Sequence, residues 1–247
     1  MQSIIKKISI GIIGLMAICI IGFFIYVQIY YKAGDLATEQ LESSDTVEVE
    51  ENGNIVFEPK TNRKDVGFIL YPGAKVEASA YAPLAKKVAE NGYRVVIADL
   101  RFNLAILSPN KAKDIIAQYD DIDSWVIGGH SLGGVMAANY VQEDEKIKGL
   151  ILLASYPQDK TNLQNESIEV ASIWGSNDEV ASHEKITAAK DLLPTDAQFI
   201  EIGGGNHAGF GDYGEQKGDG KATITNEQQI MEATSIILNV LERVSSK

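Results

Sequence analysis

Cysteine is almost missing from this chain of 247 residues. The single cysteine, Cys19, lies inside an apolar run near the N-terminus, so an intramolecular disulfide is excluded. A lone cysteine in apolar surroundings usually serves as a small hydrophobic side chain. The folded part of the chain must therefore be held together by its hydrophobic core.

Basic side chains are also in short supply. The chain has 22 Lys and Arg against 34 Asp and Glu, which gives a net charge of -12 at pH 7. Proteins that bind nucleic acid usually present a basic face, so we expect no nucleic-acid partner. Internal repeats and low-complexity tracts are absent too, which favours one globular domain after the apolar N-terminal run.

That apolar run covers residues 8–31 and contains no charged side chain. As a helix it is long enough to cross a bilayer core of about 30 Å. We predict that residues 1–31 form a cytoplasmic stub and an uncleaved transmembrane anchor. The alternative is a cleaved signal peptide, which would leave a secreted protein. Such peptides usually have an apolar region of about 7–15 residues, and no small-x-small cleavage site follows this one.

Charges on the two sides of the run predict its orientation. Lys6 and Lys7 precede it, whereas acidic residues dominate the segment that follows. The positive-inside rule then places the N-terminus in the cytoplasm and the main domain outside the cell membrane. Residues 32–45 are acidic and polar with little periodicity, so we expect a short tether there and a folded domain over residues 46–247.

The domain alternates short apolar runs with amphipathic segments. A hairpin comes first, with Asn52-Gly53 as its turn. The apolar runs read as strands buried on both faces, at residues 66–70, 95–98, 125–127, 150–153, 170–174 and 199–202. Most of the intervening segments read as helices, at residues 81–91, 111–119, 132–142, 183–192 and 227–244. This order predicts an α/β fold, a mostly parallel sheet with helices on both faces.

Ligands in such sheets bind at the carboxyl ends of the strands. One of these ends carries Gly129-His130-Ser131-Leu132-Gly133, which matches G-x-S-x-G between a predicted strand and a predicted helix. That setting is the one in which the motif forms a nucleophile elbow. A tight structural turn is the alternative interpretation, and the setting favours Ser131 as a nucleophile.

A serine nucleophile needs a base, and the base needs an acid that fixes its tautomer. Of the three histidines, His207 follows the last predicted strand, whereas His130 adjoins the serine and His183 begins a predicted helix. Asp178 follows the strand at 170–174, with Glu179 as the alternative acid. The order Ser131, Asp178, His207 is the order used by enzymes with a nucleophile elbow.

Three segments, GGHSLGG, WGSND and GGGNH, together resemble the α/β-hydrolases, from residue 66 to the C-terminus. The first loop, Tyr71-Pro72-Gly73-Ala74, is similar to that of a compact bacterial group of membrane-anchored or secreted members, where better-known relatives carry His-Gly. The resemblance implies an oxyanion hole made by the N–H of Leu132 and by a second N–H from this loop. We assign the second donor to Ala74, with Gly73 as the alternative.

The connection at residues 154–169 is too short for the helical cap that many α/β-hydrolases insert there. An uncapped site favours small or exposed esters, and Arg101 and Asn103 are candidates for lining it. Asp212 and Asp219 do not have the spacing of a calcium loop, so neither a metal nor a cofactor is expected.

The sequence as a whole predicts a serine hydrolase that acts at the outer face of the membrane. Its substrate would be a small-molecule or lipid-like acyl ester, cleaved through an acyl-enzyme on Ser131 with His207 as base and Asp178 as acid. Two alternatives stay open. One is a binding module that uses the same fold, and the other is an acyltransferase or peptidase that uses the same triad.

Overall fold

The computed structural model describes the backbone of residues 2–247 and the side chains of residues 11–247. The chain divides into two compact units, one ending at Tyr30 and the other covering residues 31–247. The first unit is the helix α1 (Gln2–Gln28). Its window Gly11–Gln28 has a mean hydropathy of 2.3 and is long and apolar enough to cross a membrane.

The second unit is built on one eight-stranded sheet with the order β1-β2-β4-β3-β5-β6-β7-β8. Strands β1 (Val47–Asn52) and β2 (Asn54–Pro59) form the predicted hairpin, and β2 pairs antiparallel with β4. All other neighbours are parallel. These strands are β3 (Val66–Tyr71), β4 (Arg94–Ile97), β5 (Ser124–His130), β6 (Ile147–Leu153), β7 (Glu169–Gly175) and β8 (Gln198–Ile202). Each coincides with one of the six predicted apolar runs.

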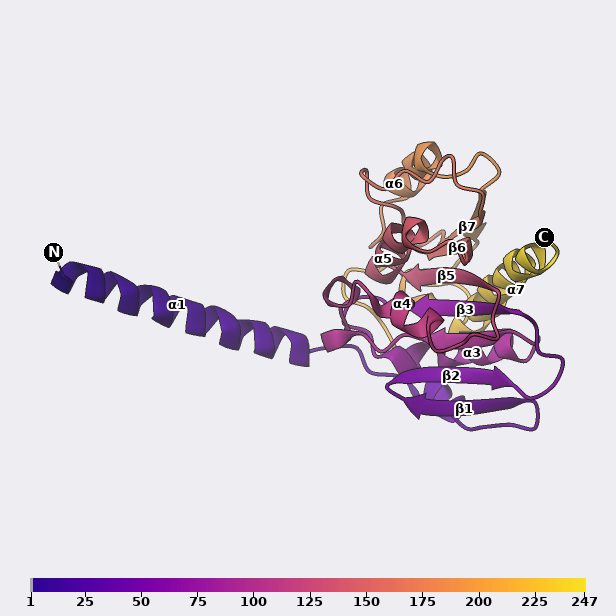
Figure 1. The fold of residues 1–247 in the computed structure, drawn as a ribbon, viewed down its shortest axis with the longest axis horizontal. Coiled ribbons are helices and arrows are strands. Elements are labelled where there is room, and N and C mark those ends of the chain that lie inside the picture. The colour runs from indigo at the N-terminus through magenta and orange to yellow at the C-terminus, as the bar shows by residue number, and fades with distance from the viewer. Residues whose placement is uncertain (1) are drawn as a thin grey trace. The chain divides into compact units, whose positions relative to one another are not determined.

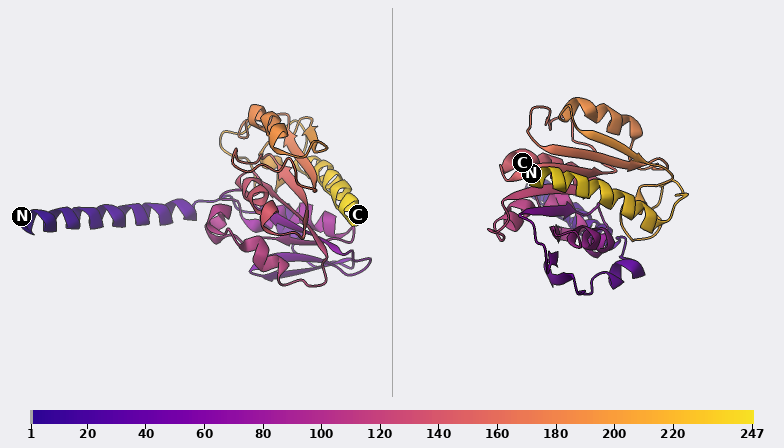
Figure 2. Two further views of the ribbon diagram at one scale, coloured as in Figure 1. Left: turned by 45° about the horizontal axis from the view of Figure 1, so that its top comes forward. Right: turned by 90° about the vertical axis from the view of Figure 1, so that its right-hand side faces the viewer.

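Helices cover both faces of the sheet and bury one apolar cluster on each (Figure 1). One face is covered by α3 (Ala82–Ala89) and by α7 (Asn226–Ser245), which Figure 2 shows in yellow along the sheet. The other is covered by α4 (Lys111–Ile116) and α5 (Leu132–Tyr140). The short helix α6 (His183–Ala188) follows β7. The expected α/β architecture is confirmed.

The predicted tether at residues 32–45 is wrong, because this segment is folded onto the domain. It contains the helix α2 (Asp35–Glu39), in which Ala37 is fully buried. The backbone N–H groups of Gly34 and Ala37 donate to the backbone oxygen and to Oδ2 of Asp212, both at 2.8 Å. Small residues allow this close approach of the backbone. The sequence gives no periodic apolar signal for it, because the contacts are hydrogen bonds to a distant aspartate.

Residue Tyr31 also belongs to the domain. Its N–H donates to the carbonyl of Lys75 at 2.7 Å, and its own carbonyl accepts from the N–H of Glu77 at 2.9 Å. The two segments form a parallel bridge between Tyr31 and Val76. The chain therefore enters the domain beside the loop that follows β3, at the carboxyl edge of the sheet.

Candidate active site

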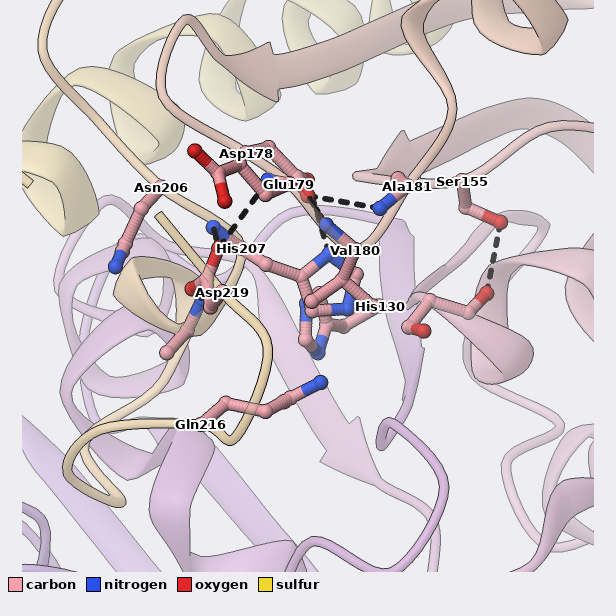
Figure 3. A network of polar contacts seen from close by, with 12 residues as sticks. His130, Ser155, Asp178, Glu179, Val180, Ala181, Asn206, His207, Gln216 and Asp219 are labelled. Carbon is pink, nitrogen blue, oxygen red and sulfur yellow. Dashed lines mark hydrogen bonds and ion pairs between the residues drawn. The ribbon is translucent and has the colours of Figure 1, made fainter. Parts of the chain in front are cut away.

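Ser131 occupies a sharp turn between β5 and α5. Its φ of 53° and ψ of -124° lie in a region that residues with a side chain rarely adopt. Hydrogen bonds on both sides hold this conformation. The N–H of Ser131 donates to the carbonyl of Leu153 at 2.9 Å, and its carbonyl accepts from the hydroxyl of Ser155 at 2.8 Å. The second of these bonds is the dashed line at Ser155 in Figure 3. This is the backbone geometry of the nucleophile elbow predicted from the motif.

The two glycines of the motif are required by close backbone contacts. A Cβ on Gly129 would overlap the backbone of Gly133, and a Cβ on Gly133 would overlap the carbonyl oxygens of Tyr71 and Pro72. The first contact lets α5 start directly behind the strand. The second brings the start of α5 against the loop that follows β3, which is the loop predicted to complete the oxyanion hole.

Asp178 and His207 are hydrogen-bonded although 29 positions separate them in the sequence. Nδ1 of His207 lies 2.9 Å from Oδ2 of Asp178, and both side chains are buried. The other carboxylate oxygen, Oδ1, accepts the backbone N–H groups of Val180 and Ala181, each at 2.8 Å (Figure 3). The acid is thereby fixed on both sides. Glu179, the alternative acid, is exposed.

The second imidazole nitrogen of His207, Nε2, is buried and has no hydrogen-bond partner among the described residues. The loop behind this ring is held by Asp219, whose carboxylate oxygens accept the N–H groups of His207 at 3.2 Å and of Ala208 at 2.8 Å. Asp212 and Asp219 therefore serve as acceptors for backbone amides. Among the described residues, no group of three His, Cys, Asp or Glu could hold a metal ion.

His130, the residue before the serine, packs against the candidate base. Its ring centroid is 4.5 Å from that of His207. Its Nδ1 lies 2.8 Å from the hydroxyl of Tyr81, and that hydroxyl accepts the N–H of Gly73 at 2.9 Å. All of these groups are buried. The chain Gly73–Tyr81–His130 thus joins the first loop to the imidazole that packs against His207.

Sequence reasoning did not find Tyr81, because nothing in the chain pairs it with a residue 49 positions away. It also did not find Gln216, which accepts a hydrogen bond from the hydroxyl of Tyr213 at 3.1 Å. In Figure 3 the side chain of Gln216 points toward the two imidazole rings. The positions of both residues are set by tertiary contacts around the histidines, which leave no local signal in the sequence.

Of the two loop amides considered for the oxyanion hole, that of Gly73 is already engaged with Tyr81. Leu132 is the first residue of α5, and N–H groups in the first turn of a helix have no partner within the helix. The positive end of the helix dipole also points to this position. An anion beside Ser131 would thus lie at the N-terminus of this helix, next to Leu132.

The two candidates for lining the site, Arg101 and Asn103, lie in the loop after β4. The carbonyl of Asn103 accepts the N–H of Lys75 at 2.8 Å, which packs this loop against the loop after β3. Arg101 lines a groove of about 500 Å³ together with Asp99, Leu107 and Lys111. That groove does not include the three predicted catalytic residues, so contact of Arg101 or Asn103 with substrate stays a prediction.

A different groove, of about 570 Å³, is lined by residues 156–160 and by side chains of α6 and of the turn that follows it. Tyr156, which lines it, follows Ser155, the residue whose hydroxyl donates to the carbonyl of Ser131. Its wall combines apolar residues such as Pro157 and Leu192 with polar and charged ones, among them Asp159 and Lys185. A groove with mostly apolar walls and a few polar groups is the usual form of a site for a small organic molecule.

Burial lowers the pKa of His130 well below its usual value of 6.5, and the neighbouring His207 adds to the effect. The unfolded chain takes up a proton near pH 6.5 that the folded chain does not, so the free energy of unfolding should fall as the pH drops below that value. The loss can reach about 1.4 kcal/mol per pH unit. Urea unfolding of the full chain in detergent, from about pH 7 to about pH 5, compares wild type with His130→Gln. The variant should lose less stability over this range, and an equal loss in both proteins would contradict the prediction.

Residues 67–231 match the sequence profile of a group described as the alpha/beta hydrolase family. Among curated protein sequences, none matches significantly.

Solved structures share the fold at low sequence identity. The esterase domain of a Rhodothermus marinus protein matches with a TM-score of 0.57 and 11% identity, over 77% of this chain and 95% of that one. An alpha-beta serine hydrolase homologue from Coxiella burnetii matches with a TM-score of 0.57 and 15% identity, over 80% and 98%. A predicted CIB-like hydrolase from Thermoplasma acidophilum matches with a TM-score of 0.53 and 16% identity, over 78% and 97%.

Proposed function

Because this chain belongs to the alpha/beta hydrolase family, we propose that it is a serine esterase with Ser131 as nucleophile, His207 as base and Asp178 as acid. Hydrolysis is the general class of activity that the family implies, and the three residues are our assignment. The observation that carries it is the buried hydrogen bond of 2.9 Å between His207 and Asp178, beside a serine in a strained turn. The esterase domain of Rhodothermus marinus, with a similar fold, supports an ester as the bond that is cleaved.

In the proposed first step, Oγ of Ser131 attacks the carbonyl carbon of the ester and its proton passes to Nε2 of His207. The carbonyl oxygen becomes an oxyanion. When the tetrahedral intermediate collapses, the bond to the leaving oxygen breaks and His207 returns the proton, so that an alcohol leaves and an acyl-enzyme remains. Water then repeats the sequence, releasing a carboxylic acid and restoring Ser131. Asp178 holds the imidazole in the tautomer with the proton on Nδ1.

The oxyanion would be bound by the N–H of Leu132 and by the N–H of Ala74. Gly73 is the weaker candidate because its N–H already donates to Tyr81. Removing one such donor typically costs about 100- to 1,000-fold in kcat. The bond between Gly73 and Tyr81 would therefore serve to aim the next amide of the loop at the site.

We further propose that α1 anchors the enzyme in the cell membrane, with the N-terminus in the cytoplasm and the catalytic domain outside. The length and hydropathy of α1 support the anchor, and the basic residues before it support the orientation. The substrate would be an acyl ester that reaches an uncapped site, since the connection from β6 to β7 contains no helix. The groove beside Tyr156 is our candidate for holding the acyl or the alcohol part.

The proposal is tested by labelling the full-length protein in detergent with a fluorophosphonate, which forms a covalent bond with activated serines. Wild type should be labelled and should hydrolyse p-nitrophenyl esters. Comparing esters of graded acyl length shows which length the enzyme prefers. Ser131→Ala should abolish labelling and turnover, because the attacking oxygen is gone. The matched control is Ser246→Ala, at the exposed end of the chain after α7, which should behave as wild type. Labelling that persists in Ser131→Ala would disprove the assignment, and a folded but inert wild type would favour the binding-module alternative.

A further inference from the structure

Large apolar side chains are exposed on the domain at the edge that carries the elbow. Among the described residues after Tyr31, five such side chains are exposed. Four lie in loops at the carboxyl ends of β4 and β7, namely Phe102, Ile106, Leu107 and Val180. The fifth, Met231, lies on α7. Exposed apolar residues that gather at one place usually mark a binding surface.

The sheet order places these side chains on both sides of Ser131. Strand β5, which leads into the elbow, lies between β4 and β7 in the order β4-β3-β5-β6-β7. Ile106 and Leu107 follow β4, and Val180 follows β7. The nucleophile is therefore flanked by apolar side chains along the edge where the parallel strands end. Figure 1 shows β3, β5, β6 and β7 in this order across the sheet.

The loop after β4 holds its apolar side chains outward by hydrogen bonds. The N–H of Arg101 donates to the hydroxyl of Ser108 at 3.0 Å, and the N–H of Leu107 donates to the carbonyl of Leu104 at 3.0 Å. Ala105 is buried and fixes the loop to the core, while Ile106 is 58% exposed. An ordered loop that displays a large apolar side chain is suited to a partner that covers it.

The charges near this loop indicate no preference for a charged partner. The groove beside it is lined by two cationic residues and two anionic ones: Arg101, Lys111, Asp99 and Asp114. The charges balance, so contact would depend on removing apolar surface from water. A hydrocarbon surface provides such contact without matched charges.

Chain connectivity indicates that this hydrocarbon surface is a membrane. The candidate span ends at Gln28, and Tyr31 is hydrogen-bonded to the loop after β3, next to the apolar loop. Three residues extend over at most about 10 Å. This limit is set by the covalent chain alone and holds for any arrangement of the helix. The point where the chain leaves a membrane is thus tied to the catalytic edge of the domain.

We propose that Ile106 and Leu107 insert into the outer surface of a lipid bilayer and that the esterase takes its ester from that bilayer. The substrate class is then an acyl ester with a part that stays in the membrane. This inference depends on the proposed function, both for the anchor and for the chemistry at Ser131. Phe102 and Val180 lie at the same edge and would border the contact.

Insertion is tested with the full-length protein in phosphatidylcholine vesicles, with and without bromine on the acyl chains. Bromine quenches tryptophan fluorescence only within the hydrocarbon. Ile106→Trp should show quenching beyond that of wild type. The matched control Ser246→Trp should not, because Ser246 is exposed and its neighbour Lys247 pairs with Glu169 at the first residue of β7, on the opposite edge of the sheet. Equal quenching at both positions, or no added quenching at Ile106→Trp, would overturn the proposal. Concentration-dependent cross-linking at position 106 without quenching would indicate a second copy of the chain instead, and would also overturn it.

Substrate origin is tested with the double variant Ile106→Asp and Leu107→Asp. The measured quantity is the ratio of turnover of a long-chain ester dissolved in the vesicles to turnover of p-nitrophenyl acetate in water. Burying one large aliphatic side chain is equivalent to about a tenfold change in an equilibrium or more, so the ratio should fall at least about tenfold. Met231→Asp should leave the ratio unchanged. An unchanged ratio in the double variant would overturn the inference about the membrane, even if fluorophosphonate labelling of Ser131 still supports the esterase. If the wild-type protein is not labelled at all, the esterase proposal itself is wrong.

Discussion

His207→Ala is expected to lower kcat by about 10⁶-fold, the loss seen when a member of such a triad is removed from a serine hydrolase. The reason is the place of Nε2, which is buried and has no hydrogen-bond partner in the part of the chain that the structure describes, while Nδ1 is held by Asp178. Without the ring, the elbow loses the imidazole that the buried carboxylate of Asp178 holds, whereas the ring of His130 is held by the hydroxyl of Tyr81 instead. The measurement is single-turnover hydrolysis of a p-nitrophenyl ester by the full-length protein in detergent.

The control for this variant is His183→Ala, which removes a histidine at the start of α6 and should leave kcat as in wild type. Both variants are also examined by circular dichroism, so that loss of the fold is not mistaken for loss of the base. A folded His207→Ala protein that retains more than about a hundredth of wild-type kcat would show that the base lies elsewhere. His130 would then be the next residue to test, since its ring packs against that of His207.

Asp178→Asn is expected to lower kcat by about 10⁴-fold, the loss seen for the equivalent change in another serine hydrolase. The contacts of Asp178 explain why the amide would be harmful. Its Oδ1 accepts two backbone N–H groups, so an asparagine should keep its oxygen there and turn its NH₂ toward Nδ1 of His207. Two donors would then face each other unless the imidazole changes its tautomer, and a ring with its proton on Nε2 cannot act as the base.

Glu179→Gln is the matched control for this prediction, because it neutralises the adjacent carboxylate, which the sequence leaves open as an alternative acid. Glu179 is exposed, so kcat should not change. Steady-state kcat and KM are measured for both variants with the same ester. A loss in Glu179→Gln as large as that in Asp178→Asn would refute the choice of acid, and a loss confined to KM would show that Asp178 acts in binding only.

The sheet could be predicted from the sequence because each parallel strand is a short run that is apolar on both faces. Val66–Tyr71 is buried at every position, and such a run has few other structures open to it. Topology then places the residues after these runs along one edge. For this reason Asp178 and His207 could be paired across 29 positions, and the structure places them in hydrogen-bond contact.

Other parts of the site could not be predicted, because they depend on contacts that leave no local pattern. The segment with α2 reads as a tether, since its main contacts are backbone N–H groups that donate to Asp212 and to Glu77. The link from Gly73 through Tyr81 to His130 involves a hydroxyl and an imidazole whose types suit many roles. Backbone donors and buried polar pairs are specified by the assembled fold, and periodicity does not report them.

The bridge between Tyr31 and Val76 has a consequence for release of the domain by proteolysis. Tyr31 holds the loop after β3 through its own N–H and carbonyl, and this loop is the one assigned to the oxyanion hole. A cut before Tyr31 would free the domain with that loop supported, whereas a cut between Glu39 and Thr46 would leave Tyr31 with the anchor fragment. Cleavage at the second position would thus separate the domain from the anchor and, at the same time, remove the covalent link between the domain and Tyr31, which supports this loop.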